Sequence, residues 1–441
     1  RYPMAYYHPS FSVGNYMEYV NYAAPAAMAP AQIPILHYLA NNNAFFNSNK
    51  ANLDKTPVFV EKMSELFGLY PFKNEKYGHA QANIGGGMEQ QTMSTMSSFG
   101  TSLIAHELGH QWFGNSVTCA TWNHIWINEG FATYADYLMN EQLPTLYTSS
   151  AASVMTAMHN NVMSATGGSV FVPDADLFDE NRIFSNRLSY EKGASIIHTL
   201  RFELQNDNLF FQILRQFQTQ FKDKVATADD FKAVAENVSG KNFTNFFNQW
   251  YYGQGYPTYS INYYTRNDSL VMNITQTTSS PGNTSFFSGL VEYTIQSGQG
   301  DTTVKFNLTS NGQEFRFKYI KDPTGIVIDP NNWIINRVGS INRVNPPGEP
   351  PVNPPGPGTP SIVFEPYVSP NPSPGNITLR YPTNVYTQAA LFDTQGRLMQ
   401  KIQLSQNTNQ YQVGTLLANG VYFIRFTGAE NDKTIKVLVV H

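Results

Sequence analysis

The chain has 441 residues, of which 41% are hydrophobic and 14% aromatic, and this composition supports well-packed interiors in two to four domains. Only 14% of the residues are charged and the net charge is −4, so nucleic acid is not an expected partner. The single cysteine excludes an intrachain disulfide, and no stretch reaches the ~18 apolar residues that a transmembrane helix requires.

Helical patterns of apolar residues dominate the first part of the chain, residues 1–255. Its opening stretch, "RYPMAYYHPSF", is expected to form a first strand, and the lack of an initiator Met indicates a processed or trimmed start. Further along, "IGGGMEQ" (84–90) is typical of a strand that ends in small residues, against which an extended peptide could lie.

The stretch "LIAHELGHQWFGN" (103–115) places His106, Glu107 and His110 within an apolar helix. Residues four apart on a helix are separated by about 40° around the axis and about 6 Å along it, so the two imidazoles converge on one point, as two ligands of Zn²⁺ must. Glu107 is rotated by about 100° from His106, so it can flank the metal and take a proton from water. The alternative is a buried helix with incidental polar residues, but burying three ionisable groups without a partner is costly.

The stretch "WINEGFATYADYL" (126–138) predicts a second helix that opens at about Asn128. Glu129 would then lie in its first turn, after the intervening residues 111–128. Two neutral imidazoles and one carboxylate leave a fourth position for water, which is typical of a catalytic zinc. The sequence therefore predicts one Zn²⁺, held by His106, His110 and Glu129. The alternative is a solvated glutamate that the helix dipole favours.

The pattern changes to alternating strands near Gly255–Pro257, which predicts a β-sandwich over residues 256–344. The stretch "NPPGEPPVNPPGPGTP" (345–360) predicts a proline-rich linker, because proline at this density excludes both helix and sheet. Short apolar runs separated by turns predict a second, small β-sandwich over residues 361–441.

The spacing of these motifs resembles a known family. The H-E-x-x-H pattern, the glutamate after it, "GGGMEQ" (85–90) upstream and "YEKGA" (190–194) downstream are similar to the zinc aminopeptidases of the aminopeptidase N type, which are gluzincins. The resemblance covers about residues 1–344. It implies an α+β multidomain fold whose first part, residues 1–255, is a thermolysin-like, mainly helical peptidase domain, and it implies that the N-terminal β domain of relatives is missing.

The resemblance also implies roles in catalysis. Glu107 would be the general base and would later protonate the leaving amine. Tyr190, the first residue of "YEKGA", would donate a hydrogen bond to the oxyanion of the tetrahedral intermediate, a contact worth about 3–4 kcal/mol.

The resemblance assigns substrate binding to the glycine-rich stretch. Gly86, Gly87 and Met88 would line the edge along which the peptide lies, and Glu89 would pair with the free α-ammonium of the substrate. Because that pair forms only when the peptide begins at the site, it favours an exopeptidase over an endopeptidase.

Two residues depart from the family pattern. Gln90 stands where the family usually has Asn, which would loosen the preference for a free N-terminus. His124 stands where Asp is common, and it is either an extra polar contact near the zinc or a satisfied structural histidine. The family's large C-terminal helical domain is also replaced, by the linker and the small β module, so a more open cleft is expected.

The C-terminal module carries "SPNPSPGNITL", "FDTQGRLMQ" and "NGVYFIRF", which resemble the C-terminal sorting domain of type IX secretion cargo in Bacteroidetes. The resemblance implies export to the surface or outside of a bacterial cell, with the secretion machinery as partner. The alternative is a small sandwich that binds carbohydrate or packs against the rest of the chain.

Together these expectations describe a secreted zinc metallopeptidase, an aminopeptidase acting on peptides with a free N-terminus. Two alternatives remain: a broader metallo-endopeptidase with an open cleft, and a surface peptide-binding protein with a degenerate peptidase domain.

Overall fold

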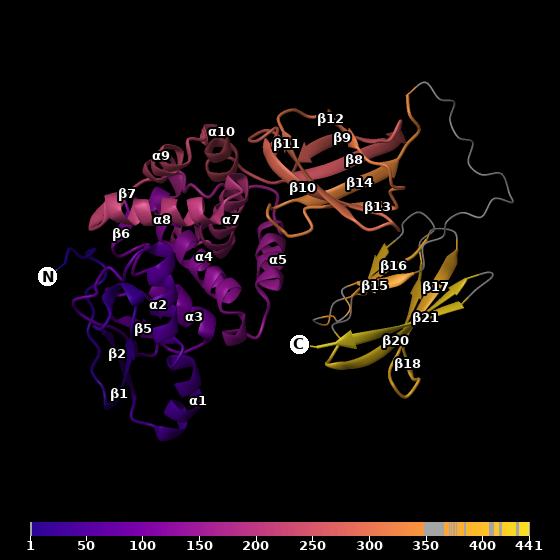
Figure 1. Cartoon of the computed structure of the whole chain (residues 1–441). Helices are drawn as coiled ribbons and strands as arrows, with labels where there is room; N and C mark the ends of the chain where they lie inside the picture. The colour runs from indigo at the N-terminus through magenta and orange to yellow at the C-terminus, as the bar shows by residue number, and fades with distance from the viewer. Residues whose placement is uncertain are drawn as a thin grey trace. The chain divides into compact units, whose positions relative to one another are not determined.

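The computed structural model describes residues 2–347 and 366–440, apart from 370, 372, 374, 376, 383–384, 405–409, 414–416 and 429–431. The chain divides into two compact units, Arg1–Pro347 and Gly348–His441 (Figure 1). The division falls within the predicted proline-rich linker, whose residues 348–360 lie outside the described part. The domain boundaries at 255–256, 344–345 and 360–361 stay predictions.

A five-stranded sheet begins the first unit, with the strand order β1–β2–β3–β5–β4. Its strands are β1 (Tyr16–Ala23), β2 (Ile33–Ala40), β3 (Tyr77–Gln81), β4 (Gly87–Met88) and β5 (Ser94–Met96). Strands β2, β3 and β5 are parallel, whereas β4 pairs antiparallel with β5 at the end of the sheet. Residues 2–15 form no strand, so the strand predicted for "RYPMAYYHPSF" is wrong; Pro3 and Pro9 lack the N–H groups that strand pairing needs.

Outside this sheet, helices make up most of the first unit as far as Tyr251. The longer ones are α1 (Asn43–Leu53), α2 (Thr56–Phe67), α3 (Thr101–Gly109), α4 (Trp126–Gln142), α5 (Ala151–Val162), α7 (Gly193–Leu204), α8 (Asp207–Phe221) and α9 (Ala228–Ser239). The shorter helices are η1 (Ala26–Met28), η2 (Trp122–His124), η3 (Pro144–Leu146), η4 (Asp174–Asp176), α6 (Glu180–Ile183), the π-helix η5 (Asn186–Lys192), α10 (Thr244–Phe246) and the π-helix η6 (Phe247–Tyr251). A small two-stranded sheet pairs β6 (Val117–Cys119) with β7 (Lys224–Ala226).

Helix α4 is the centre of this helical part, because it packs against α3, α5 and α7 and is buried along most of its length (Figure 1). Phe131 of α4 stacks on Phe113, which follows α3, with ring centroids 4.6 Å apart. Gly109 allows the two helices to approach closely, since a Cβ at that position would lie 2.8 Å from Cβ of Ala135. The relative position of α3 and α4 is therefore fixed by packing.

The last part of the first unit is a sandwich of two sheets around one hydrophobic core. Its strands are β8 (Pro257–Arg266), β9 (Ser269–Thr278), β10 (Gly289–Gln296), β11 (Thr302–Leu308), β12 (Gln313–Lys318), β13 (Gly325–Ile328) and β14 (Arg337–Arg343). One sheet has the order β11–β10–β13 and the other β12–β9–β8–β14, in which β14 runs parallel to β8.

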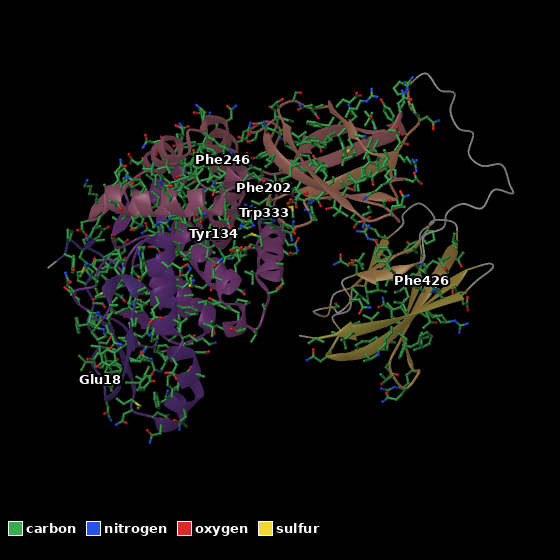
Figure 2. All side chains as sticks on the ribbon, viewed as in Figure 1. Glu18, Tyr134, Phe202, Phe246, Trp333 and Phe426 are labelled. Atoms are coloured by element: carbon green, nitrogen blue, oxygen red, sulfur yellow. The ribbon has the colours of Figure 1, made fainter. Side chains whose placement is uncertain are left out.

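Trp333 joins this sandwich to helix α7. Its ring stacks on His198 at 4.5 Å and on Phe202 at 5.2 Å, and its carbonyl accepts a hydrogen bond of 2.9 Å from Oγ1 of Thr199 (Figure 2). Stacked aromatic contacts of this kind add to the free energy gained by burying apolar area. The sandwich therefore supports α7 directly.

The second unit is a smaller pair of sheets with its own core, which includes Leu391, Ile424, Phe426 and Val437 (Figure 2). Its strands are β15 (Tyr367–Ser369), β16 (Thr378–Arg380), β17 (Tyr386–Phe392), β18 (Leu398–Gln403), β19 (Gln410–Gln412), β20 (Gly420–Gly428) and β21 (Asp432–Val439), ordered β15–β16–β19 and β18–β17–β20–β21. Across both units, none of the described helices combines the length and apolar character needed to cross a membrane.

Candidate metal centre and substrate cleft

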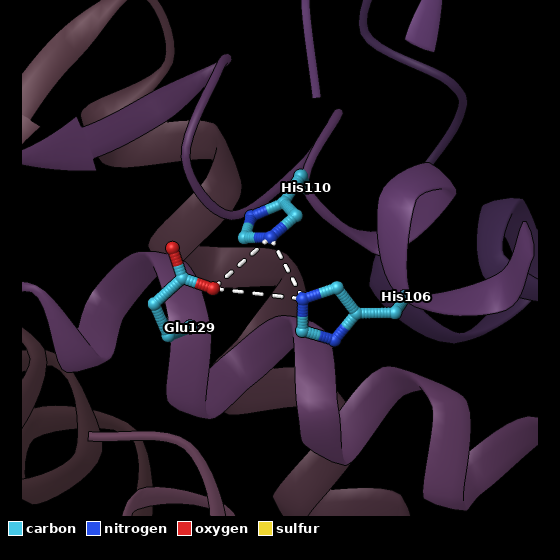
Figure 3. Close-up of side chains that lie close together, drawn as sticks. All are labelled: His106, His110 and Glu129. Atoms are coloured by element: carbon cyan, nitrogen blue, oxygen red, sulfur yellow. Dashed lines mark hydrogen bonds and ion pairs between the residues drawn. The ribbon is translucent and has the colours of Figure 1, made fainter. Parts of the chain in front are cut away.

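Two helices bring three metal-ligating side chains to one point (Figure 3). His106 lies in the last turn of α3, His110 directly follows that helix, and Glu129 lies in the first turn of α4. The Nε2 atoms of the two histidines are 3.1 Å apart, and Oε2 of Glu129 lies 3.5 Å from Nε2 of His106 and 3.3 Å from Nε2 of His110. Donors about 2.0 Å from a tetrahedral Zn²⁺ would be about 3.3 Å apart, so this donor set fits such an ion.

The orientation of His110 also suits a metal ligand. Its Nδ1 lies 3.1 Å from the carbonyl oxygen of Phe113. A proton on Nδ1 donates to that carbonyl, and Nε2 then keeps its lone pair for an ion, as in many protein metal sites.

Without a bound ion, the charged side chains of this centre shift one another's pKa values. Burial alone would lower the pKa of His110, but the carboxylates of Glu129 and Glu89 raise it to about 10. Burial alone would raise the pKa of Glu129, but His110 and His106 lower it to about 2. A buried carboxylate thus holds a positive charge beside it, and a divalent ion would replace the proton on His110.

Glu107 lies next to this centre and is buried, with 4% of its surface exposed. Burial raises its pKa to about 8. Its Oε2 has no hydrogen-bond partner in the described part of the chain. Its other oxygen faces the glycine-rich strand, since a Cβ added to Gly87 would lie 2.3 Å from Oε1 of Glu107. A buried carboxyl group with a raised pKa beside a metal-ligating set has the environment of a general base.

Of the strand expected for "IGGGMEQ", only Gly87 and Met88 pair, and they form the edge strand β4. Gly87 pairs with Met96 and Met88 with Thr95, and β4 is the last strand of its sheet. Gly86 has a φ of +73°, which glycine adopts without strain.

Glu89 follows this edge and is 7% exposed. Its backbone carbonyl accepts a 2.8 Å hydrogen bond from Nδ2 of Asn115, and burial raises the pKa of its side chain. The neighbouring Gln90 turns back onto the sheet instead, where its Oε1 accepts a 3.1 Å hydrogen bond from the backbone N–H of Thr95.

Tyr190 enters the site from the π-helix η5. Its ring stacks on that of His106, with centroids 5.9 Å apart and planes 11° from parallel. Burial first, and the charge of Glu129 second, raise the pKa of Tyr190 well above its usual value, so its hydroxyl keeps its proton and can donate it in a hydrogen bond. A π-helical turn of this kind often marks a functional site.

A cleft of about 690 Å³ connects all the predicted site residues. Besides those residues, its lining includes Tyr7, Leu103, Trp122, Asp136, Met158, Phe184 and Glu191. None of the described residues that line it is lysine or arginine, whereas five are Glu or Asp: Glu89, Glu107, Glu129, Asp136 and Glu191. Such a cleft favours a positively charged group on the ligand.

Sequence reasoning missed the contribution of the N-terminal segment. Tyr7 lines the cleft and accepts a 3.2 Å hydrogen bond from Nδ2 of Asn128. His8 is 1% exposed, and its Nε2 lies 3.9 Å from Oε1 of Glu89. These contacts join positions more than 80 residues apart, and no local pattern in "AYYHPS" signals them.

His124 lies away from the metal-ligating cluster. Its Nδ1 is 2.8 Å from the hydroxyl of Tyr251, its ring is parallel to that of Tyr251, and the N–H of Ala228 also donates to it. These contacts are those of a satisfied structural histidine.

The three converging side chains are compatible with a bound metal ion, and a buried carboxyl group and a cleft lie beside them. Comparison with known proteins agrees with this arrangement. Residues 83–250 match the peptidase family M1 domain, and residues 367–441 match the secretion system C-terminal sorting domain. The chain carries a family M1 peptidase domain followed by a secretion sorting domain, which confirms both resemblances in the sequence.

Among curated proteins, aminopeptidase M1-D of Oryza sativa subsp. japonica is 33% identical over 215 residues, which are 48% of this chain and 23% of the relative. Aminopeptidase N of Bos taurus is 30% identical over 187 residues, 40% of this chain and 18% of the relative. The chain thus spans a quarter or less of the length of the curated relatives it matches.

A solved structure of Legionella pneumophila aminopeptidase A in complex with aspartic acid has the same fold over much of the chain. The TM-score is 0.63 at 14% identity, and the match covers 74% of this chain and 38% of the other. The match supports an α+β multidomain fold, and the sorting domain indicates export to the cell surface or the medium.

Proposed function

We propose that this chain is the catalytic part of a secreted zinc aminopeptidase, which removes residues from the N-terminus of peptides. The observation that carries the proposal is the convergence of His106, His110 and Glu129 within 3.5 Å of one another. The buried carboxyl group of Glu107 and the peptide-binding edge at β4 lie beside them.

The three converging side chains would hold one Zn²⁺, which, when bound, lowers the pKa of water and polarises a carbonyl group. Glu107 takes a proton from the attacking water; burial raises its pKa to about 8 in the metal-free site, and the positive charge of a bound ion would lower it again, so that the carboxylate form is available near neutral pH. It then returns that proton to the leaving amine. Tyr190 donates its hydrogen bond to the carbonyl oxygen as negative charge develops there.

The substrate's backbone would lie along Gly86, Gly87 and Met88, where the small residues allow close approach. Glu89 would accept hydrogen bonds from the free α-ammonium. No lysine or arginine competes for this carboxylate among the described residues that line the cleft. A blocked N-terminus would lose the ion pair, so the geometry favours exopeptidase action.

The test combines zinc content with hydrolysis of a panel of aminoacyl anilides and of matched free and N-acetylated peptides. We expect about one zinc per chain and much faster cleavage of peptides with a free N-terminus than of acetylated ones. In Glu89→Ala, rates on free-amino substrates should fall far more than rates on acetylated ones, with zinc retained. Internal cleavage of acetylated peptides by the wild type would favour the metallo-endopeptidase instead. Zinc binding and peptide affinity without hydrolysis would favour a peptide-binding protein.

A further inference from the structure

Lys192 carries a buried amino group, and burial, followed by the charges of Arg187 and Arg182, lowers its pKa to about 7. Its side chain is 1% exposed, and its Nζ donates to the carbonyl oxygens of Gly168, at 2.8 Å, and Gly253, at 3.3 Å. No acidic side chain lies within ion-pair distance of it in the described part of the chain. A buried amino group costs free energy unless it is hydrogen-bonded, and the two carbonyl groups are the partners that the structure provides for it.

Lys192 is the last residue of η5, the π-helix that carries Tyr190 two residues earlier. The two carbonyl groups come from elsewhere. Gly168 lies in a loop with a φ of +100°, and Gly253 lies in the loop that precedes β8. Lys192 therefore joins the turn bearing Tyr190 to two loops that are distant in sequence.

The other neighbours of Tyr190 are fixed as well. Oγ of Ser189 donates a 2.7 Å hydrogen bond to the carbonyl of Ile183. The carboxylate of Glu191 accepts hydrogen bonds from Nδ2 of Asn161, at 2.6 Å, and of Asn186, at 3.0 Å. Each residue flanking Tyr190 is thus held by a side-chain contact, but Glu191 is half-buried and its contacts are open to water, whereas the contacts of Lys192 are not.

Where η5 meets α7, the chain also touches the helix that carries Glu129. A Cβ at Gly193 would lie 3.1 Å from Cα of Gly130, and one at Gly130 would lie 3.2 Å from Cα of Gly193. This close backbone contact sets the distance between the two helices. Lys192 anchors the end of η5 next to this contact, through its hydrogen bonds to the carbonyl groups of Gly168 and Gly253.

We infer that Lys192 is a positioning residue for Tyr190: by binding the carbonyl groups of Gly168 and Gly253, it fixes the turn that aims the tyrosine hydroxyl at the developing oxyanion. The inference rests on the proposed peptidase function and adds to it a residue that never contacts substrate. Preorganised donors stabilise a transition state because they need no rearrangement during the reaction.

The test is a double-mutant cycle between Lys192→Met and Tyr190→Phe in the full chain, measured on an aminoacyl anilide. Methionine keeps most of the volume of lysine and removes the amino group. We expect Lys192→Met to lower kcat by about 10- to 100-fold, part of what one oxyanion donor supplies, with KM and zinc content little changed. In the Tyr190→Phe background, Lys192→Met should lower kcat by less than about threefold, because the tyrosine hydroxyl that Lys192 positions is already absent.

A second measurement separates positioning from a merely structural role. Lys192→Met should weaken binding of a tetrahedral phosphinic peptide as much as it lowers kcat, and should leave binding of the product amino acid unchanged. If the methionine variant does not fold, Lys192→Gln keeps donors for the two carbonyl groups and should show the same pattern with a smaller loss.

Arg182→Met is the matched control, because Arg182 donates to the carbonyls of Ser169, at 2.7 Å, and Phe171, at 2.8 Å, in the same loop but from outside η5. Its kcat should stay within about threefold of wild type. An equal loss from Lys192→Met in both backgrounds would overturn the inference. A wild-type chain that binds zinc and hydrolyses nothing would instead overturn the proposed function.

Discussion

A Cβ added to Gly87 would lie 2.3 Å from Oε1 of Glu107, so the proposed peptide-binding edge and the proposed general base are in direct contact. Gly87→Ala must therefore displace the carboxyl group or the strand. We expect kcat/KM to fall by at least ~10²-fold, since general-base catalysis contributes about that much, while zinc stays bound. Steady-state kinetics and metal analysis of the purified variant measure both.

Gly85→Ala is the control for this variant. A Cβ at Gly85 would meet no atom within 4 Å, and the residue needs no left-handed backbone. Its activity should match that of the wild type. Normal activity in Gly87→Ala would show that Glu107 can move away without loss, which contradicts its assignment as the base.

Tyr190→Phe removes the proposed oxyanion donor and leaves the ring that stacks on His106. We expect kcat to fall by about 10²- to 10³-fold, because one such donor supplies that factor, and KM to change little. Tyr264→Phe, in the β-sandwich, serves as the control. A Tyr190→Phe variant within a few-fold of wild type would remove the tyrosine from the mechanism.

Zinc affinity should rise with pH. In the metal-free site the pKa of His110 is about 10, so the imidazole carries a proton below that pH and an ion must displace it. The affinity should therefore increase about tenfold per pH unit below pH 10, with release of about one proton. Calorimetric titration of chelator-treated protein in two buffers of different ionisation enthalpy measures the proton. A pH-independent affinity would show that His110 is neutral before the metal binds.

Two buried histidines should make the fold sensitive to acid. Burial lowers the pKa of His37 to about 4 and that of His159 to about 3, whereas the unfolded value is about 6.5. Because the folded pKa values are depressed, the stability linked to these groups is present above about pH 6.5 and is lost as the pH falls toward 4.

The expected slope is about 1.4 kcal/mol per pH unit for each histidine that gains a proton on unfolding. His159→Leu should flatten the decline in unfolding temperature between pH 6.5 and 4, as measured by thermal melts at each pH. An unchanged profile in that variant would show that His159 titrates normally in the folded chain.

Gln90→Asn should not tighten the preference for a free N-terminus. The Gln90 side chain points to the backbone N–H of Thr95, so its extra methylene does not alter the cleft. The shorter side chain loses that hydrogen bond, with an expected cost of about 1 kcal/mol in unfolding free energy. The ratio of rates on free and acetylated peptides is the measurement, and a marked rise in that ratio would place Gln90 in the substrate site after all.

The sequence predicted the metal-ligating geometry because it depends on short-range periodicity. The spacing of His106 and His110 fixes the relative direction of their side chains on any helix. To place Glu129, the prediction needs only the position at which the next helix begins. That helix begins at Trp126, two residues before the expected Asn128, because the turn η2 leads almost directly into it.

Features that depend on contacts across the fold were not predictable in this way. Apolar spacing does not separate a π-turn from an α-turn, so the local conformation at Tyr190 came only from the structure. The same holds for the contact between Gly87 and Glu107, and for Tyr7 beside Asn128, where the N-terminal segment lies in the cleft instead of forming a strand.

The brevity of β4 has a kinetic consequence. A strand of two residues offers a peptide few main-chain partners, enough to set its direction and too few to retain it for long. Main-chain partners are also the same for every sequence, so the proposed edge would order many different peptides with similar, modest affinity. In the proposed peptidase, little free energy would be spent on the bound ground state, so KM would be high and turnover would be fastest where peptides are abundant.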